Sequence, residues 1–382
     1  MMSNLSSLCT YAKGKVSVDT LSKQNYVSTE NMLPNKGGIV DAGGLPSVQY
    51  VQQYIKGDIL VSNIRPYFKK IWMANEDGGC SNDVLVFRAA HGCDSTFLYY
   101  VLSNDAFFNY ASATSKGTKM PRGDKIAIMQ YEVPCFDHET QLRIGKLLRS
   151  IDARITVNKK INDNLEQQAQ SYFQELFVDN ADPEWTTGTI SDLGTVVGGS
   201  TPSKAKPEYY TESGIAWITP KDLSNNKSKF VSHGENDITE LGLRNSSASI
   251  MPEGTVLFSS RAPIGYIAIA AGEVTTNQGF KSVVPKPEIG TPFVYFFLKN
   301  TLPVIEGMAS GSTFKEVSGS TMKNVPAVIP DAETLAKFSD FCAPIFAQQR
   351  ILEEQNQSLA TLRDNLLPKL MSGEIDVSAV QL

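Results

Sequence analysis

The chain has 382 residues, of which 41% are hydrophobic and 20% charged, which is ordinary for a soluble globular protein with two or three domains. It has no apolar run near the roughly 20 residues of a membrane-spanning helix, and Met1–Thr20 lacks the pattern of a secretory signal. The five scattered cysteines suit reduced thiols, so a cytoplasmic location is predicted. A net charge of −5 argues against a generic nucleic-acid binder, because a basic surface supplies most non-specific affinity.

The sequence is internally repeated. Glu139-Thr140 recurs as Glu333-Thr334, an offset of 194 residues that holds without a gap across a helix-like segment. A second register joins Gly57–Ser62 to Gly254–Ser259. Because self-similarity at a fixed period marks a repeated structural unit, we expect two copies of one module.

The first 136 residues predict short strands separated by turns. Strands are expected at Ile59–Val61 and Val84–Phe87, and one helix over Phe97–Tyr110. Paired glycines predict the turns, at Gly37-Gly38, Gly43-Gly44 and Gly78-Gly79.

A long helix is predicted from about His138 to Phe177. Its seam follows alternating spacings of four and three residues, which is the heptad pattern of a coiled coil. The seam residues are Ile151, Ile155, Asn158, Asn162, Leu165, Ala169, Tyr172 and Leu176.

Residues 182–330 repeat the texture of the first module, with strands expected at Trp217–Thr219, Thr255–Phe258 and Tyr266–Ile269 and a helix start at Phe293–Leu298. A second long helix is predicted from about Asp331 to Met371, with a break near Pro344 and a kink or frayed end at Pro368. Its seam is Ile345, Gln349, Leu352, Asn356, Leu359, Arg363, Leu366 and Leu370.

The two helices are expected to pair with each other. Asn162 and Asn356 take equivalent places in the two copies, and polar seam residues fix register and partner. The chain order of module, helix, module, helix favours antiparallel pairing, with a spacer of roughly 60 Å at most. In the alternative interpretation, each helix packs only on its own module.

The repeated plan carries a family resemblance. With Gly57–Ser62, Gly254–Gly265 and the tail Leu366–Ile375, the chain resembles the specificity subunit of type I restriction–modification systems over essentially its whole length. The resemblance implies an α+β fold with two similar mixed α/β target-recognition domains separated by two long antiparallel coiled-coil helices. The domains would be 1–136 and 180–330, and the spacer helices 137–179 and, with a tail, 331–382.

The same resemblance implies function and partners. The chain would be a non-catalytic subunit that reads a bipartite, asymmetric double-stranded DNA target and docks two methyltransferase subunits, with restriction (motor–nuclease) subunits joining the complex and no membrane partner. It would hold no cofactor, with S-adenosylmethionine, Mg and ATP on partner subunits. One departure is the lead-in: Trp185–Leu193 opens the second module, whereas its counterpart around Asn4–Leu8 is clipped, which puts the first module's opening strand in question.

Candidate DNA contacts come from matched loops of the two modules. Arginine forks suit bases and phosphates, amides can read adenine, and glycine and hydroxyl groups permit close backbone contact. The alternatives are solvated turns, surface ion pairs and amides that only stabilise turns. The candidates are Ser62, Arg65, Lys69, Lys70, Asn82, Lys116, Thr118, Lys119 and Arg122 in the first module, and Lys221, Ser259, Ser260, Arg261, Asn277, Gln278, Thr313 and Lys315 in the second.

Catalytic signatures are missing from the sequence. It has no Asn-Pro-Pro-aromatic run for amino-methyl transfer and no phosphate-binding loop, and its three histidines lack zinc-ligand spacing. The paired carboxylates Glu353 and Glu354 are expected on the solvated outer face of the second helix. Two further hypotheses are kept, a coiled-coil scaffold that does not read DNA and an enzyme with a site that leaves no sequence signature.

Overall fold

The computed structural model describes residues 2–311 and 315–378. The chain separates into two compact units, the first containing residues 2–156 and 357–378 and the second containing residues 157–311 and 315–356. Each unit combines one module with parts of both long helices. These helices are α4 (His138–Gln174), which continues as a π-helical turn over Glu175–Asp179, and α10 (Ala332–Ser372).

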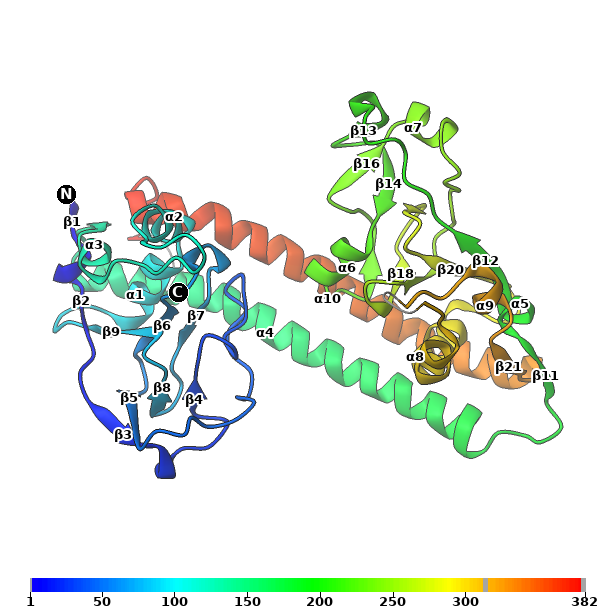
Figure 1. Ribbon diagram of the computed structural model, residues 1–382, viewed down its shortest axis with the longest axis horizontal. Coiled ribbons are helices and arrows are strands. Elements are labelled where there is room, and N and C mark those ends of the chain that lie inside the picture. The colour runs from blue at the N-terminus through cyan, green and yellow to red at the C-terminus, as the bar shows by residue number, and fades with distance from the viewer. Residues whose placement is uncertain (1, 312–314, 379–382) are drawn as a thin grey trace. The chain divides into compact units, whose positions relative to one another are not determined.

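The first unit is built around an antiparallel four-stranded sheet, the core sheet, with strand order β2-β9-β6-β7 (Figure 1). A second four-stranded sheet, the side sheet, has the order β3-β5-β8-β4, and β1 pairs with β10. The strands are β1 (Met2–Asn4), β2 (Cys9–Tyr11), β3 (Lys15–Ser17), β4 (Tyr26–Val27), β5 (Tyr50–Tyr54), β6 (Ile59–Ser62), β7 (Ile71–Met73), β8 (Gly78–Cys80), β9 (Val84–Ala89) and β10 (Glu132–Pro134). The helices are α1 (Ser95–Ser103), α2 (Asp105–Ala113) and α3 (Lys125–Met129).

The core sheet of the first unit is buried on both faces. Ile59 and Val61 of β6 point into a core shared with α1, α2 and the start of α4, whereas Leu60 between them packs with Val27 and Tyr54 of the side sheet. Successive side chains of a strand alternate between faces, so a strand covered on both sides reads as the continuous apolar run seen in the sequence.

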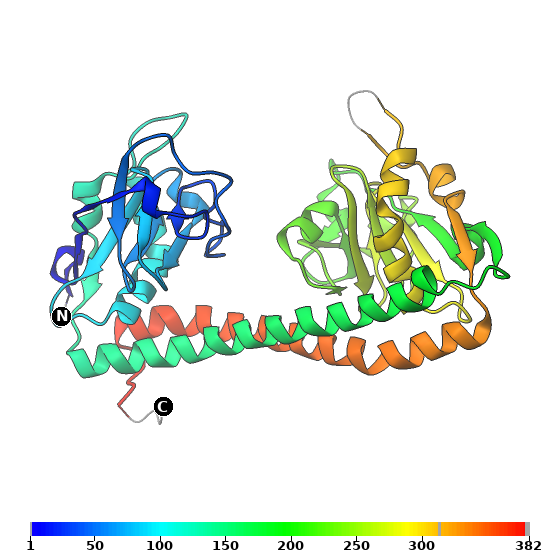
Figure 2. The same cartoon turned by 90° about the horizontal axis from the view of Figure 1, so that it is seen from below.

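The second unit repeats this plan with an added strand. Its core sheet has the order β12-β20-β17-β18-β15, its side sheet the order β13-β16-β14-β19, and β11 pairs with β21. In Figure 2 helix α8 (gold) lies against the strands of this unit, and its buried residues share one core with α4 and α10. The strands are β11 (Thr186–Thr189), β12 (Gly194–Gly198), β13 (Tyr210–Thr211), β14 (Ile215–Ile218), β15 (Phe230–Val231), β16 (Asn236–Ile238), β17 (Val256–Ser260), β18 (Ile264–Ala270), β19 (Thr275–Thr276), β20 (Lys281–Pro285) and β21 (Pro326–Ile329). The helices are α5 (Ile190–Leu193), α6 (Pro220–Asn225), α7 (Glu240–Arg244), α8 (Thr291–Met308) and α9 (Gly319–Lys323).

The two side sheets share a parallel pair of strands but extend it on different sides. β4 is parallel to β8 in the first unit, and β14 is parallel to β19 at the equivalent place in the second. The third strand, β5, joins β8 in the first unit, whereas β16 joins β14 in the second. The modules therefore keep a common base and differ in the outer strands added to it.

Three local predictions about the first module were wrong or incomplete. The opening strand in question is present as β1, paired with β10 as β11 is paired with β21. The helix predicted over Phe97–Tyr110 is two helices, because Asn104 leaves α1 in an extended conformation and its side chain caps α2. Gly78 and Gly79 form strand β8 and not a turn.

Close packing explains glycine at this strand position. A Cβ on Gly78 would lie 2.2 Å from the carbonyl oxygen of Asn25 and 2.4 Å from the hydroxyl of Tyr54. A Cβ on Gly79 would likewise lie 2.6 Å from side-chain atoms of Leu21 and of Val51. Glycine inside a strand often marks such a close approach of neighbouring groups.

In the second unit, α4 and α10 lie antiparallel (Figures 1 and 2). Asn158 donates to Asn356 at 3.0 Å, whereas Asn162, four residues further along α4, donates to the carbonyl of Gln349, seven residues earlier in α10, at 3.3 Å. Gln349 returns a hydrogen bond of 3.2 Å to the carbonyl of Asn162. Of the other predicted seam residues in this unit, Ile345 and Leu352 are buried and Leu165, Tyr172 and Leu176 half-buried.

The helices also pair within the first unit. Arg363 forms an ion pair with Asp152 at 2.8 Å, and Asp152 accepts a hydrogen bond of 2.5 Å from the hydroxyl of Tyr100. Of the predicted seam residues here, Ile151 and Leu370 are buried and Ile155, Leu359 and Leu366 are half-buried. The predicted fold class, two mixed modules with two long antiparallel helices, is confirmed.

The break expected near Pro344 is absent, because α10 is continuous from Ala332 to Ser372. Pro344 is exposed, and its neighbours Cys342, Ile345 and Phe346 are buried in the core. Packing of an apolar face supplies most of the stability of a helix in a protein, so it offsets one lost backbone hydrogen bond. No helix in the described ranges is long and apolar enough to cross a membrane.

Candidate nucleic-acid interface

A polar hollow lies where the two parallel strands of the second side sheet end; we call it the second hollow. The segments that follow β14 and β19, Thr219–Asp222 and Asn277–Gly279, form two of its walls. Arg261, Thr201 and Lys204 also line it, and its volume is about 460 Å³. The structure therefore brings four predicted contact residues to one place: Lys221, Arg261, Asn277 and Gln278.

The first module has a hollow at the equivalent position, beyond β4 and β8; we call it the first hollow. It is lined by Ser28–Asn31, Asp41–Pro46, Ser81 and Asp83, and its volume is about 640 Å³. The loop after each first strand is fixed in the same way. The Asn31 side chain accepts from the Ser28 amide at 2.6 Å, and Asp222 accepts from the Thr219 amide at 2.7 Å.

The two hollows differ in charge. The second is lined by three cations, Lys204, Lys221 and Arg261, together with the carboxylates Asp222 and Glu235. The first is lined by the carboxylates Glu30, Asp41 and Asp83, and no Lys or Arg lines it in the described part of the chain. Sites of the same architecture thus offer different chemistry to whatever they bind.

Beside the first hollow, three loops of the first module are hydrogen-bonded into one surface. The Asn63 amide donates to the Asp83 carbonyl and the Arg65 amide donates to the Pro121 carbonyl, both at 2.8 Å. Arg122 forms an ion pair of 2.9 Å with Asp83. These contacts bring the predicted residues Arg65, Lys116 and Arg122 together, with Asn82 exposed next to Asp83.

Several predicted cations already have acidic partners. Lys69 pairs with Asp105, Lys116 with Asp124, Lys221 with Glu235 and Arg261 with Glu316. Lys70 donates to the Thr29 carbonyl at 2.6 Å, and burial lowers its pKa. Thr118, Lys119 and Lys315 are exposed, whereas Thr313 lies outside the described residues.

Three predicted contacts, Ser62, Ser259 and Ser260, were wrong because these side chains are buried. Ser62 donates to the Ile64 carbonyl at 3.1 Å and Ser260 to the Gly279 carbonyl at 3.1 Å. Ser259 donates to the Pro263 carbonyl and accepts from the Tyr266 amide, both at 2.8 Å. The hydroxyls hold the turns that present Arg65 and Arg261, and they do not face solvent.

Substitution of Ser259 by alanine tests this structural role. We expect the second unit to lose about 1–3 kcal/mol of stability, because the buried Ser259 hydroxyl is removed and the half-buried Tyr266 amide loses its acceptor. DNA affinity per folded molecule should stay unchanged. Ser213→Ala, which removes an exposed hydroxyl in the same unit, is the matched control. Weaker DNA binding by a Ser259→Ala protein of normal stability would restore the direct-contact interpretation.

A buried ionic cluster ties the second module to its helices. Lys229, 7% exposed, pairs with Glu166 of α4 at 2.7 Å and donates to Gln349 of α10 at 2.9 Å. Glu166 also pairs with Lys299 of α8 and accepts from the Tyr295 hydroxyl at 3.1 Å. Burial alone would raise the pKa of Glu166, but the two ammonium groups outweigh it and hold that pKa at about 2.

Glu353 extends the cluster and corrects a prediction. Its carboxylate accepts the backbone amides of Lys229 and Phe230 at 2.8 and 3.0 Å. Burial raises the pKa of Glu353, which is therefore not the solvated outer-face residue that the helical pattern suggested. Glu354 does lie on the exposed face.

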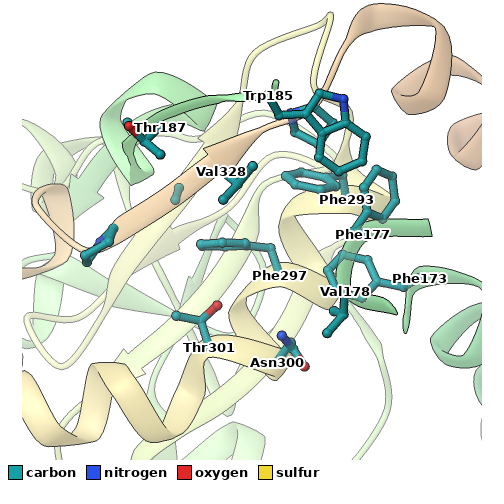
Figure 3. A pocket seen from close by; sticks show the side chains of 14 residues that line it. Phe173, Phe177, Val178, Trp185, Thr187, Phe293, Phe297, Asn300, Thr301 and Val328 are labelled. Carbon is teal, nitrogen blue, oxygen red and sulfur yellow. The ribbon is translucent and has the colours of Figure 1, made fainter. Parts of the chain in front are cut away.

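A third hollow in the second unit is aromatic and apolar. Figure 3 shows Phe177, Trp185, Phe293 and Phe297 around it, with Asn300 and Thr301 to one side. Its volume is about 380 Å³, and none of its lining residues is charged. This hollow has an aromatic wall and no cation on its lining, so the candidate interface is restricted to the two polar hollows and the loops beside them.

Two modules of common design, each with a polar hollow and adjoining cationic loops, define a duplicated DNA-recognition protein. The chain belongs to the family described as the type I restriction modification DNA specificity domain, whose family model matches residues 1–167 and 183–362. As a member, it is a specificity subunit, a non-catalytic component of type I restriction–modification systems that acts in DNA sequence recognition with the other subunits.

Individual relatives support this membership. The chain is 39% identical over 194 residues to the type I restriction enzyme MjaIX specificity subunit of Methanocaldococcus jannaschii, covering 48% of the chain and 45% of that protein. It is 24% identical to the HindI specificity subunit of Haemophilus influenzae in an alignment covering 92% of the chain and 94% of the relative. The crystal structure of a type I restriction-modification S subunit from M. genitalium has the same fold, with a TM-score of 0.61 at 17% identity, covering 97% and 96% of the two chains.

Proposed function

We propose that the chain reads a bipartite, asymmetric target in double-stranded DNA, with one module on each half-site. The observation that carries this proposal is the pair of equivalent hollows with different linings, three carboxylates in the first and three cations in the second. A symmetric target would call for two identical readers. Two readers of common frame and different chemistry fit two different half-sites.

The paired helices would fix the half-site spacing and dock two methyltransferase subunits. Their seams are occupied by mutual contacts, yet large apolar side chains remain on their outer faces. Val157 and Ile161 of α4 are 48% and 41% exposed, and Ile351 of α10 is 47% exposed. Val157 and Ile161 lie one turn apart on the same face of α4, and a contiguous apolar patch on this face would suit a protein partner.

Chemistry would belong to the partners. The methyltransferase subunits would bind S-adenosylmethionine and flip the target adenine, and restriction (motor–nuclease) subunits would use Mg and ATP. The specificity subunit would hold none of these cofactors and would determine which DNA sequence the complex binds.

A shortened helix pair tests the spacing role. Deleting residues 154–160 of α4 and 354–360 of α10 removes one heptad from each helix and takes out the bonded pair Asn158 and Asn356 together. The remaining seam positions keep their heptad order. Seven residues correspond to about 10 Å of helix, or about three base pairs of DNA. The preferred spacer, measured by mapping methylated adenines, should therefore shorten by about three base pairs.

Duplicating the same two heptads is the matched control and should lengthen the spacer by the same amount. An unchanged spacer in both proteins would remove the spacing role. If the chain assembles with methyltransferase subunits but selects no half-site at all, it acts as a coiled-coil scaffold that does not read DNA.

A further inference from the structure

The second hollow presents hydrogen-bond donors that have no partner. Arg261 contacts Glu316 through Nη1 at 3.4 Å, the limit of a hydrogen bond, which leaves Nε and Nη2 without partners among the described residues. Gln278 accepts from the Thr201 hydroxyl through Oε1, so its Nε2 is similarly unused within those ranges. Lys204 forms no ion pair with any described residue.

Three of the remaining polar side chains of the hollow have acceptor oxygens that are already engaged. Asp222 accepts from the amide and the hydroxyl of Thr219. The Asn277 carbonyl oxygen accepts from the Gly279 amide at 2.8 Å. Glu235 accepts from Lys221. The hollow therefore offers a ligand the guanidinium fork of Arg261, the ammonium of Lys204 and the amide donors of Gln278 and Asn277, with the Asn236 carboxamide as a mixed donor and acceptor.

Only one base matches such a surface in the major groove. Guanine shows two acceptors, N7 and O6, and no donor. Adenine and cytosine both show an amino group, and thymine shows a single acceptor beside a methyl group. An arginine fork bonds the two guanine acceptors together, which is the commonest specific contact between proteins and DNA.

We propose that Arg261, assisted by Gln278, recognises a guanine in the half-site read by the second module. This assignment rests on the proposed function and adds the base class to it. Phosphate oxygens of the DNA backbone can also accept from these donors. Because phosphates occur in every sequence, a phosphate contact would change affinity for all sequences equally, whereas a guanine contact would change the preference at one base pair. The first hollow, with carboxylates and no cation on its described lining, does not share this preference.

The test uses the full chain assembled with its methyltransferase subunits and a DNA library with both half-sites randomised. Bound DNA is sequenced for the wild type, for Arg261→Ala and for Gln278→Ala. The wild type should select at least one G·C pair in one half-site. Arg261→Ala should lower the discrimination at that pair by about 5- to 150-fold, with the other positions unchanged. Gln278→Ala should lower it at the same pair by less.

Two further variants keep the result interpretable. Arg244→Ala removes an exposed arginine of the same module outside the hollow and should leave every preference intact. Glu316→Gln removes the carboxylate that competes for Arg261 and should strengthen selection at the same G·C pair. This gain cannot come from a protein that fails to fold.

Three outcomes would overturn the assignment. Uniform weakening by Arg261→Ala, with the slope of log affinity against log salt falling by about 1, would make Arg261 a phosphate contact. Loss of preference at an A·T pair would exclude guanine, and no change at any position would exclude contact. In each of these cases, the proposed function still stands if the wild-type protein selects two half-sites. If the wild-type protein selects no half-site, both the proposed function and the guanine assignment are excluded.

Discussion

Replacement of Glu166 by alanine is expected to destabilise the second unit by about 3–5 kcal/mol, because it leaves the ammonium of Lys229 buried without its counterion. Lys229 is 7% exposed, and its ammonium lies 3.5 Å from the ring centre of Phe346. Burial lowers the pKa of Lys229 to about 8 even with Glu166 present. Lys299, which also pairs with Glu166, is half-buried and can turn toward water.

Removal of both charges should cost much less. Glu166→Leu combined with Lys229→Met replaces a buried ion pair by apolar groups of similar size, a change that is often neutral or stabilising. A double variant as unstable as Glu166→Ala would mean that packing, and not the unpaired charge, sets the cost.

The pH dependence follows from the lowered pKa of Glu166. A carboxylate whose pKa falls from 4.5 to about 2 on folding contributes stability that is complete above about pH 4.5 and is lost as the pH falls toward 2. The stability difference between wild type and Glu166→Gln should therefore shrink as the pH falls from 4.5 toward 2. A difference that grows in acid would contradict this assignment.

Tryptophan fluorescence can follow the second unit alone. The chain has three tryptophans, Trp72 in the first unit and Trp185 and Trp217 in the second. In a Trp72→Phe background, a urea titration therefore reports the unit that contains Glu166. Separate observation matters because a chain of two units does not have one defined free energy of unfolding.

Phe173→Ala is expected to cost the second unit about 3–5 kcal/mol, the range for truncating a buried phenylalanine. Phe173 of α4 is 2% exposed, and its ring centre lies 5.2 Å from Phe177, 5.8 Å from Phe293 and 5.8 Å from Phe338. It therefore joins α4 to α8 and to α10. Loss of this ring should lower the urea midpoint in the same fluorescence assay.

Ile161→Ala is the matched control on the same helix. Ile161 is 41% exposed, so its truncation should change stability by about 0.5–1 kcal/mol at most. Equal destabilisation by the two substitutions would contradict the role of the Phe173 ring, because alanine favours the helix in both proteins and only the lost packing differs.

The long helices and their seam could be predicted from sequence because heptad spacing is a local signal. Asn158, Asn162 and Asn356 stood at seam positions in the sequence, and the structure shows them bonded across the helix pair or to its backbone. Position alone did not reveal which side chains would pair. Helix propensity alone predicts a break at Pro344, whereas the buried neighbours Cys342, Ile345 and Phe346 keep the helix continuous.

The alternation of short strands and turns in the modules could be predicted from sequence, but the local structure at particular residues could not. Gly78 follows the rules of a turn in sequence, yet Asn25 and Tyr54 approach it too closely for any other residue in a strand. Ser259 looked like a contact residue because burial is not visible in a short polar motif. The outer strands of the side sheets pair differently in the two modules, and no repeat register records that difference.

The ionic cluster could not be found from sequence. Lys229 lies 63 residues from Glu166 and 120 residues from Gln349 along the chain. Lys229 and Glu166 look like ordinary surface residues in the sequence, and Gln349 is predicted only as a seam position. The second hollow is partly predictable, since Arg261 and Gln278 lie in matched loops of the repeat, whereas Lys204 lies in an irregular loop before β13 and carries no such signal.

The first unit draws part of its core from far downstream in the chain. Leu367, Leu370, Met371 and Val377 pack with Ile144 and Leu148 of α4 and with the module formed by the first 136 residues. During synthesis on the ribosome, this module is made long before its last core residues, from Leu367 onward. Its apolar face must stay uncovered for that interval or be shielded by a chaperone. A message cut short after the second module would therefore yield a protein with an open core, which cellular proteases would remove before it could occupy DNA.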